Sequence, residues 1–404
     1  MKILLINIAI FILNIIYLPF KLLPIQNKIT FISRQSNKKS EDIKLLEKEI
    51  KRADKNIKVV ILCKKIEKGF LNKIKYIFHM FIQMYHLSTS KVIILDSYCI
   101  AASVLKKKKN TVIIQMWHAL GSFKKFGYSI LDKKEGSSRK LAEAMKMHFN
   151  YDYIFTSSEE SKRYFAEAFN YPIKNIIVMP LPRVDLLLDK KIISKKKRKI
   201  IKTYHELSKK ENILYAPTFR KNGEDSKPIY NLINKIDYSK YNLIIKLHPL
   251  SKLKIDDDRV IIDRKFSTID MMYVSDVVIT DYSAIVFEAS LLNKPLMFYC
   301  YDYSSYYNSR NFYLDYKKMP GVIDENAEKI VSSIEKKDYK LDSVKDFSIK
   351  YINLNKEKAT KKIVEFIFAK MKWYIFYWLC RIICYTLNEW MGGIYEIINS
   401  STLL

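Results

Sequence analysis

The sequence has few of the residues that build flexible linkers, disulfide frameworks and metal sites. Its 404 residues include 8 glycines, 10 prolines, 5 cysteines and 6 histidines. So few glycines and prolines argue against long flexible linkers. The cysteines are odd in number, and no pair has zinc-site spacing with histidines nearby. They therefore predict neither a secreted disulfide framework nor a zinc site, and they favour a reducing, cytosolic location.

Two common nucleotide-binding motifs are also missing. The chain has no Gly-x-Gly-x-x-Gly motif and no Walker-type loop, so neither a nicotinamide enzyme nor a P-loop ATPase is indicated. The sequence predicts no metal site. We expect little or no metal requirement and no cofactor.

Acidic residues are scarce beside basic ones. There are 42 of them against 71, which gives a net charge of +29. Such an excess suggests polyanionic partners, meaning nucleic acid, an anionic membrane surface or phosphate-rich substrates. A solvated, lysine-rich surface with no such partner would also explain much of this positive charge. Because the chain has no interleaved basic and aromatic strand platform of the RNA-binding kind, we expect no nucleic acid partner.

The N-terminal segment is apolar. Residues 3–20 form a run between Lys2 and Lys21 that reaches the lower limit for a membrane span. Asn7 and Asn14 interrupt it seven residues apart, so they share one helix face. A polar stripe of this kind also suits a helix that lies in the membrane interface or packs on protein.

The C-terminal segment is aromatic. Residues 373–390 carry three of the four tryptophans, together with tyrosine and phenylalanine beside basic side chains. Headgroup regions favour this composition, although a core helix docked on the body would also fit. We expect membrane-associated helices at 1–25 and 351–404, which hold the protein to the cytoplasmic face of the cell membrane.

Between these ends, short β-branched runs alternate with helical patterns such as 41–51, 158–168 and 284–292. The predicted strands are 29–33, 59–63, 92–96, 112–116, 153–157 and 176–179, then 213–216, 243–247, 260–262, 277–280 and 296–299. Such alternation predicts parallel sheets covered by helices. A lysine-rich helical stretch, 189–210, separates the two sets. The fold class is therefore α/β, with two doubly wound, Rossmann-like domains, 26–188 and 189–350, facing a cleft where ligands bind.

The most informative segment is 275–288, in which a buried strand runs into a tight turn and a helix opens at Ser283. Asp281 and Ser283 are residue types that cap helix N-termini, and Glu288 lies inside the predicted helix. The free N–H groups and the positive dipole of such a helix start suit a phosphate group. An ordinary strand–helix junction has the same pattern.

Two histidines follow predicted strands. His118 comes after 112–116, and His248 comes after 243–247. Strand ends at the cleft are where a doubly wound protein holds its reactive groups. A histidine there accepts a proton at neutral pH or donates a hydrogen bond to phosphate. One such histidine is more often structural, but one from each predicted domain favours chemistry.

Other strand ends of the second half carry side chains that suit anions. The set comprises Thr218, Arg220, Lys246, Asp302 and Arg310. Arginine is the side chain suited to forked recognition of phosphate oxygens. Each residue alone fits a surface or structural role, whereas together they predict a diphosphate pocket.

With these residues assembled, the chain resembles the CDP-glycerol glycerophosphotransferase family of teichoic acid synthesis. The resemblance covers residues 26–360 in the family's order. Its blocks are Trp117-His118-Ala119, Lys124-Lys125-Phe126-Gly127, Tyr151-Asp152-Tyr153 with Ser157-Ser158, Pro182-Arg183-Val184-Asp185, Tyr215-Ala216-Pro217-Thr218-Phe219-Arg220, Lys246-Leu247-His248-Pro249, Ser275-Asp276 to Ser283, Asn293-Lys294-Pro295, and Tyr301-Asp302 through Arg310 to Pro320-Gly321.

The resemblance implies a GT-B fold with an acceptor-binding first domain and a second domain that binds the CDP-polyol. It implies transfer of glycerol phosphate or ribitol phosphate from CDP-glycerol or CDP-ribitol to a hydroxyl of a lipid-linked (undecaprenyl-diphosphate-linked) acceptor, with release of CMP. By position, it makes His118 the proposed general base, with His248 as the second catalytic residue. It places the substrate-binding set at Lys124, Arg183, Thr218, Arg220, Lys246, Thr280, Asp281, Tyr282, Ser283, Ala284, Glu288, Asp302 and Arg310.

The chain departs from the family pattern at four positions. Ala119 and Asn311 stand where glycine is usual, Ala284 replaces a second serine, and Glu288 replaces a common aspartate. None of these changes removes a candidate acid, base or phosphate donor. They leave open which polyol is transferred.

Two other functions remain open at this point. A GT-B sugar transferase would use a nucleotide-sugar on the same scaffold, because fold alone does not fix function. A non-enzymatic basic protein that binds anionic lipid or nucleic acid would explain the net charge, but it would leave the two strand-end histidines without a purpose.

Overall fold

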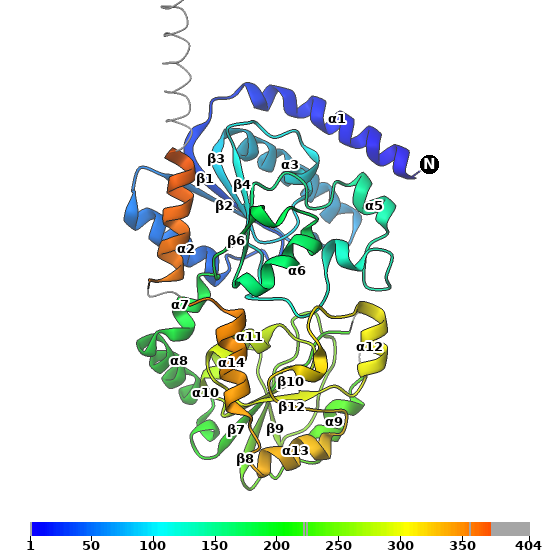
Figure 1. Ribbon diagram of the computed structural model, residues 1–404, viewed down its shortest axis with the longest axis vertical. Coiled ribbons are helices and arrows are strands. Elements are labelled where there is room, and N and C mark those ends of the chain that lie inside the picture. Colours follow the sequence, from blue (N-terminus) through cyan, green and yellow to red (C-terminus); the bar gives the residue numbers. More distant parts are fainter. Residues whose placement is uncertain (1, 221–222, 224, 355–356, 373–404) are drawn as a thin grey trace, which may run out of the picture.

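The computed structural model describes residues 2–372, except 221–222, 224 and 355–356. Two six-stranded parallel sheets organise this part of the chain, and helices cover them (Figure 1). The predicted α/β class with two doubly wound sheets is confirmed. The predicted aromatic segment 373–390 lies outside the described residues.

The first sheet has the strand order β2-β1-β3-β4-β5-β6. Its strands are β1 (Gln26–Ser33), β2 (Lys58–Cys63), β3 (Ser90–Leu95), β4 (Val112–Gln115), β5 (Tyr153–Thr156) and β6 (Ile176–Val178). All six were predicted, with ends shifted by at most three residues. β3 and β4 are buried on both faces, which explains why their sequences are continuous apolar runs instead of alternating ones.

The second sheet has the order β12-β11-β10-β7-β8-β9. Its strands are β7 (Glu211–Tyr215), β8 (Tyr241–Ile245), β9 (Val260–Ile262), β10 (Val277–Thr280), β11 (Leu296–Tyr299) and β12 (Val322–Asp324). β12 was not predicted. It has only three residues and pairs with the edge of β11, so it carries too short a run to be recognised.

Helices connect and cover the strands. Those of the first half are α1 (Lys2–Leu22), α2 (Glu41–Ala53), α3 (Phe70–Thr89), α4 (Ile100–Val104), α5 (Arg139–Ala144), α6 (Glu159–Phe169) and α7 (Arg183–Leu188). Those of the second half are α8 (Lys190–Thr203), α9 (Lys227–Ile233), α10 (Thr268–Val274), α11 (Ile285–Leu291), α12 (Tyr303–Arg310), α13 (Ala327–Glu335) and α14 (Leu341–Tyr351). Short 3₁₀ turns lie at Gly127–Ile130, Ile173–Asn175, His205–Ser208 and Tyr316–Lys318.

The carboxyl ends of the two sheets meet. The loop after β4 reaches the second half, where Lys124 pairs with Phe312 in an isolated bridge and the Tyr313 N–H donates to the Phe123 carbonyl at 2.6 Å. A Cβ added at Gly121 would lie 2.5 Å from the Phe287 ring, so only glycine allows this approach to α11. These contacts join the loop after β4 of the first sheet to segments that follow β10 and β11 of the second. The strand ends that were predicted to carry chemistry therefore lie on the edges where the two sheets face each other.

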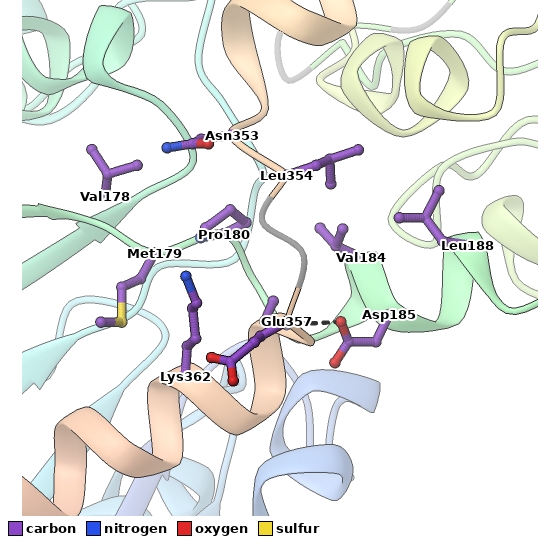
Figure 2. A pocket seen from close by; sticks show the side chains of 11 residues that line it. Val178, Met179, Pro180, Val184, Asp185, Leu188, Asn353, Leu354, Glu357 and Lys362 are labelled. Carbon is purple, nitrogen blue, oxygen red and sulfur yellow. Dashed lines mark hydrogen bonds between the residues drawn. The ribbon is translucent and has the colours of Figure 1, made fainter.

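After α14 the chain returns to the first sheet. Residues 359–372 are helical, and Ile363, Val364, Ile367 and Met371 of this helix are buried in the core. Asp185 of α7 caps it, because its carboxylate accepts from the Ala359 N–H at 2.9 Å and the Thr360 N–H at 3.0 Å. A cavity of about 150 Å³ lies beside this cap (Figure 2).

Candidate active site

His118 lies two residues beyond β4, after Trp117, whose φ of 62° turns the chain sharply. Its Nδ1 lies 2.8 Å from the Asp96 carbonyl oxygen at the end of β3. A carbonyl only accepts, so Nδ1 carries the proton and Nε2 keeps its lone pair in the neutral ring. The side-chain Nε2 of Gln35 lies 3.1 Å from the same Nδ1.

Burial sets the protonation of His118. Desolvation lowers its pKa to about 4, although the hydrogen bond to Asp96 acts in the opposite direction. The ring also lies against Trp117, with centroids 4.2 Å apart. His118 is therefore a neutral imidazole at pH 7 with a defined tautomer, which is the form that a general base requires.

His248 has the opposite tautomer. Its Nδ1 accepts from the Leu250 backbone N–H at 3.1 Å, so in the neutral ring Nε2 carries the proton. The ring is exposed after β8 and stacks on Phe219 at 5.5 Å. Together with Thr218 and Arg220 it lines one small cavity. His248 thus presents a donor where His118 presents an acceptor.

Arg220 is held rigidly in the same cavity. Its Nε is 2.8 Å from the Asp302 carboxylate, and its Nη2 is 2.9 Å from Asp281. Its guanidinium lies 5.1 to 5.4 Å from the ring centroids of three tyrosines, Tyr282, Tyr301 and Tyr306. Burial lowers the pKa of Arg220, but the two carboxylates outweigh burial and raise it. The guanidinium is therefore a permanent, fixed positive charge.

Three of the predicted substrate-binding residues are not exposed at the surface: Thr280, Asp281 and Tyr282. All three are fully buried. The Thr280 hydroxyl donates to the Ala216 carbonyl, and Asp281 accepts from the Thr218 N–H at 2.9 Å. In this structure they position Arg220 and the chain around it.

The helix after β10 begins later than expected. Its predicted start is Ser283, with Asp281 and Ser283 as capping residues. The structure begins α11 at Ile285, with Ala284 as the N-cap residue and no side-chain capping bond. The Ser283 hydroxyl accepts from the Ile285 N–H at 3.4 Å, and the Asp281 carboxylate turns inward to Arg220. The capping prediction is wrong because tertiary pairing with arginine takes the carboxylate.

The amine of Lys246 is also paired with other groups of the protein. Its Nζ lies 2.6 Å from the Asp263 carboxylate and contacts the carbonyl of Phe266. The side chain is 10% exposed. Lys246 therefore ties the end of β8 to the end of β9, behind His248.

Two cationic side chains, Lys124 and Arg310, each contact a residue of the opposite half of the chain. Lys124 comes from the first half, and its Nζ lies 3.4 Å from the Tyr306 hydroxyl. Arg310 comes from the second half, and its Nε donates to the Lys125 carbonyl at 3.1 Å. Burial, and then the charge of Arg310, lower the pKa of Lys124 to about 7. The first domain thus places an amine beside the arginines of the second.

Arg183 joins the two domains behind His118. It forms ion pairs with Asp42 of α2 at 2.5 Å and with Glu288 of α11 at 3.3 Å. Its Nη2 also donates to the His118 carbonyl at 3.3 Å. Burial raises the pKa of Glu288, against the effect of Arg183. Arg183 and Glu288, predicted as substrate-binding, therefore contact each other in this structure.

Three residues that build this site were not predicted from the sequence. Asp96 fixes the His118 tautomer, Gln35 contacts the same ring, and Asp42 holds Arg183. Asp42 stands in the first turn of α2, where an acidic residue normally only favours the helix dipole. In the described part of the chain, no three histidine, cysteine or acidic side chains are grouped to hold a metal ion.

Comparison with solved structures identifies the fold. The wall teichoic acid polymerase TagF superposes with a TM-score of 0.71 at 20% identity, over 93% of this chain and 98% of that one. A Staphylococcus aureus MnaA–UDP structure superposes with a TM-score of 0.55 at 16% identity, over 86% and 96%. The expected GT-B type fold is confirmed.

Comparison with known sequences identifies the family. The chain is 34% identical over 360 residues to the teichoic acid ribitol-phosphate primase of Bacillus spizizenii, which covers 86% of this chain and 92% of the relative. It is 31% identical over 298 residues to the teichoic acid glycerol-phosphate primase of Bacillus subtilis, which covers 72% and 76%. A family model matches residues 16–369. The chain therefore belongs to the CDP-glycerol:poly(glycerophosphate) glycerophosphotransferase family, as its motifs predicted.

Proposed function

We propose that this enzyme transfers glycerol phosphate or ribitol phosphate from a CDP-polyol to an acceptor hydroxyl and releases CMP. One observation carries the proposal: the two strand-end imidazoles have opposite tautomers. His118 keeps its lone pair on Nε2, and His248, which lines a cavity with Arg220, carries its proton on Nε2. The family relationship and the primases that this chain resembles support the same reaction.

The chemistry follows from this arrangement. The acceptor hydroxyl attacks the β-phosphorus of the CDP-polyol and forms a new P–O bond. Its proton passes to Nε2 of His118, an effect typically worth about 10²–10⁴ in rate. The bond between the β-phosphorus and the bridging oxygen breaks, and CMP leaves with that oxygen.

Two groups of the second domain stabilise the negative charge of the diphosphate. His248 and the fixed guanidinium of Arg220 stabilise the oxygens on which negative charge develops. Negative charge of a bound diphosphate would raise the pKa of His118 above about 4, which would make it a stronger base once the donor is bound.

The two substrates bind to different domains. Residues 26–188 bind the acceptor and carry the base, and residues 189–350 bind the CDP-polyol. The acceptor is lipid-linked, with an undecaprenyl-diphosphate carrier as its chemical class. The enzyme therefore acts at the cytoplasmic face of the cell membrane.

The test is CMP release from CDP-glycerol and from CDP-ribitol, with a lipid-linked acceptor analogue and product mass as the readout. His118→Ala should lower the rate of CMP release by about 10³-fold or more and leave the affinity for CDP unchanged. His248→Ala should weaken CDP binding as well. Full turnover by the His118→Ala variant would refute the base assignment.

A donor panel separates the other functions. Release of a nucleoside diphosphate from a nucleotide-sugar, with no CMP from either CDP-polyol, would identify a sugar transferase. Turnover of no donor by a folded chain that binds anionic vesicles would identify a non-enzymatic protein.

A further inference from the structure

A cavity of about 280 Å³ lies at the carboxyl ends of β1 and β2 in the first domain. The residues that line it end β2, follow β1 or β2, or belong to α3, and they include Asn37, Cys63, Lys64, Lys65, Glu67 and Lys75. A water molecule takes up about 30 Å³ in the liquid, so this space admits a phosphate group together with several waters. The cavity is separate from the one that Arg220 and His248 line in the second domain.

Three of the lining side chains are lysines whose charge is not neutralised. In the part of the chain that the structure describes, the amines of Lys64, Lys65 and Lys75 form no ion pair, and the Lys64 amine donates to the Lys75 carbonyl at 3.3 Å. The neighbouring helix α2 differs, because its Lys44 and Lys51 each pair with a glutamate. The lysines of the cavity therefore leave positive charge that an anion would neutralise.

Glu67 is the acidic residue among the lining side chains, and an amide holds it. Its Oε1 accepts from Nδ2 of Asn37 at 3.2 Å, and Oδ1 of Asn37 accepts from the Lys65 N–H at 2.9 Å. Asn37 thereby fixes the loop after β1 to the loop after β2. Three amines against one carboxylate leave the cavity with a net positive charge, which favours an anionic ligand over a neutral one.

The loop after β1 joins this cavity to the proposed base. Nε2 of Gln35 lies 3.1 Å from Nδ1 of His118, and Asn37, two residues later, lines the cavity. Two extended residues span about 7 Å, so the cavity begins within that backbone distance of the residue that contacts the base. The Lys64 N–H donates to the Ser33 carbonyl at 3.0 Å, which ties the end of β2 to the same loop. A phosphate in the cavity and a hydroxyl beside His118 therefore lie close enough to belong to one molecule.

We propose that Lys64, Lys65 and Lys75 bind a phosphate group of the acceptor, near the hydroxyl that His118 deprotonates. The inference rests on the proposed function and deepens it, because it gives the acceptor a second recognised group. Lysine amines bind phosphate oxygens through charge-assisted hydrogen bonds. An acceptor of this kind must come from an earlier phosphotransfer reaction, which supplies either a polyol phosphate unit or the diphosphate of the carrier.

Cys63 reports on the cavity, because its partly buried thiol lines it. Modification of the full chain by the anionic reagent sulfonatoethyl methanethiosulfonate, followed by peptide mass mapping, measures access to this thiol. Methyl glycerophosphate should slow the modification, and glycerol, which lacks the phosphate, should not. A Lys64→Gln, Lys65→Gln, Lys75→Gln triple variant should lose the protection and react with the reagent about tenfold more slowly. Protection that persists in the triple variant would overturn the proposal.

Kinetics with soluble acceptors test the same site. The parent should use methyl glycerophosphate with a kcat/KM about 10- to 100-fold above that for glycerol. The triple variant should lose this preference, and its rate with glycerol should stay as in the parent. A Lys48→Gln, Lys55→Gln, Lys58→Gln variant is the matched control, because it removes three exposed lysines of the same domain that do not line the cavity. A triple variant that keeps the full preference would contradict the assignment.

Two competing ligands identify the source of the phosphate. Protection of Cys63 by methyl glycerophosphate at lower concentration than by geranyl diphosphate would assign the cavity to a polyol phosphate unit, and the reverse order would assign it to the carrier diphosphate. Parent protein that either ligand protects, but that releases no CMP from either CDP-polyol, would refute the proposed function and leave the anion site standing. Release of CMP without protection by either ligand would refute the site and leave the proposed function standing.

Discussion

Single backbone groups decide the protonation pattern of the two imidazoles. The Asp96 carbonyl accepts from His118, and the Leu250 N–H donates to His248, so Nε2 is an acceptor in neutral His118 and a donor in neutral His248. The same residue-scale logic applies to Lys124. Its amine is buried beside Arg310, and this combination lowers its pKa to about 7. A diphosphate bound between these cations would restore the proton.

Lys124 therefore makes CDP binding proton-linked. At pH 8 the free enzyme holds this amine mostly neutral, so binding should take up close to one proton. Calorimetry in buffers of different ionisation enthalpy measures this uptake. Lys124→Met should abolish it, whereas Lys125→Met, a change at the next residue, should not. Equal uptake by both variants would assign the proton to another group.

The same shift has a stability consequence. The folded-state pKa of Lys124 is lowered, so the unfolded chain holds more protons between pH 7 and 10.5. Below pH 7, burial of the charged amine therefore lowers the free energy of unfolding by its full amount. This loss of stability disappears as the pH rises from 7 to 10.5. Denaturant midpoints of Lys124→Met should rise less between pH 7 and 10 than those of the parent.

At the scale of elements, one carboxylate holds the returning C-terminal helix. Asp185 of α7 accepts from the Ala359 and Thr360 N–H groups, and the Thr360 hydroxyl donates to it at 2.5 Å. The helix at 359–372 then packs Phe366 against Tyr153 of β5, at 5.1 Å between ring centroids. A residue near the domain junction thus anchors a helix that follows the second domain.

Loss of this cap should loosen the helix. Asp185→Ala should cost about 1–2 kcal/mol of stability, and Asp185→Asn, which keeps one acceptor oxygen, should cost less. Hydrogen exchange of amides 360–372 is the measurement. Asp189→Ala, which removes the cap of α8, is the matched control and should leave those amides protected. Equal exchange in all variants would show that packing alone holds the helix.

At the scale of the whole molecule, Arg183 joins both domains. It pairs with Asp42 in the first half and Glu288 in the second, and it contacts the His118 carbonyl. Removal of one partner from a buried ion pair is costly because the remaining charge is left without compensation. We infer that this contact keeps the base in register with the donor domain, as a positioning interaction.

Glu288→Gln tests that role. It should cost about 2 kcal/mol of stability and lower kcat about tenfold or more, with KM for the CDP-polyol little changed. Glu288→Asp keeps the charge, so it should stay near the parent. Steady-state kinetics and denaturant unfolding of the same preparations separate the two effects. A stability loss with unchanged kcat would reduce the contact to a structural one.

The sequence by itself determined the strands and the family. The β-branched runs of β4 and β10 encode buried parallel strands within a few residues, and the blocks around His118 and His248 place both imidazoles after strands. Such signals are local, so a window of sequence contains them. The short strand β12 shows the limit, because three residues carry no period.

Only the tertiary structure decided what the side chains do. Arg183 and Asp42 are 141 residues apart, and Arg220 and Asp302 are 82 apart, so no local pattern predicts their pairing. The same pairings turn Asp281 inward and move the start of α11 to Ile285. Pairing of charges depends on which segments the folded chain brings together, and that depends on the packing of both sheets.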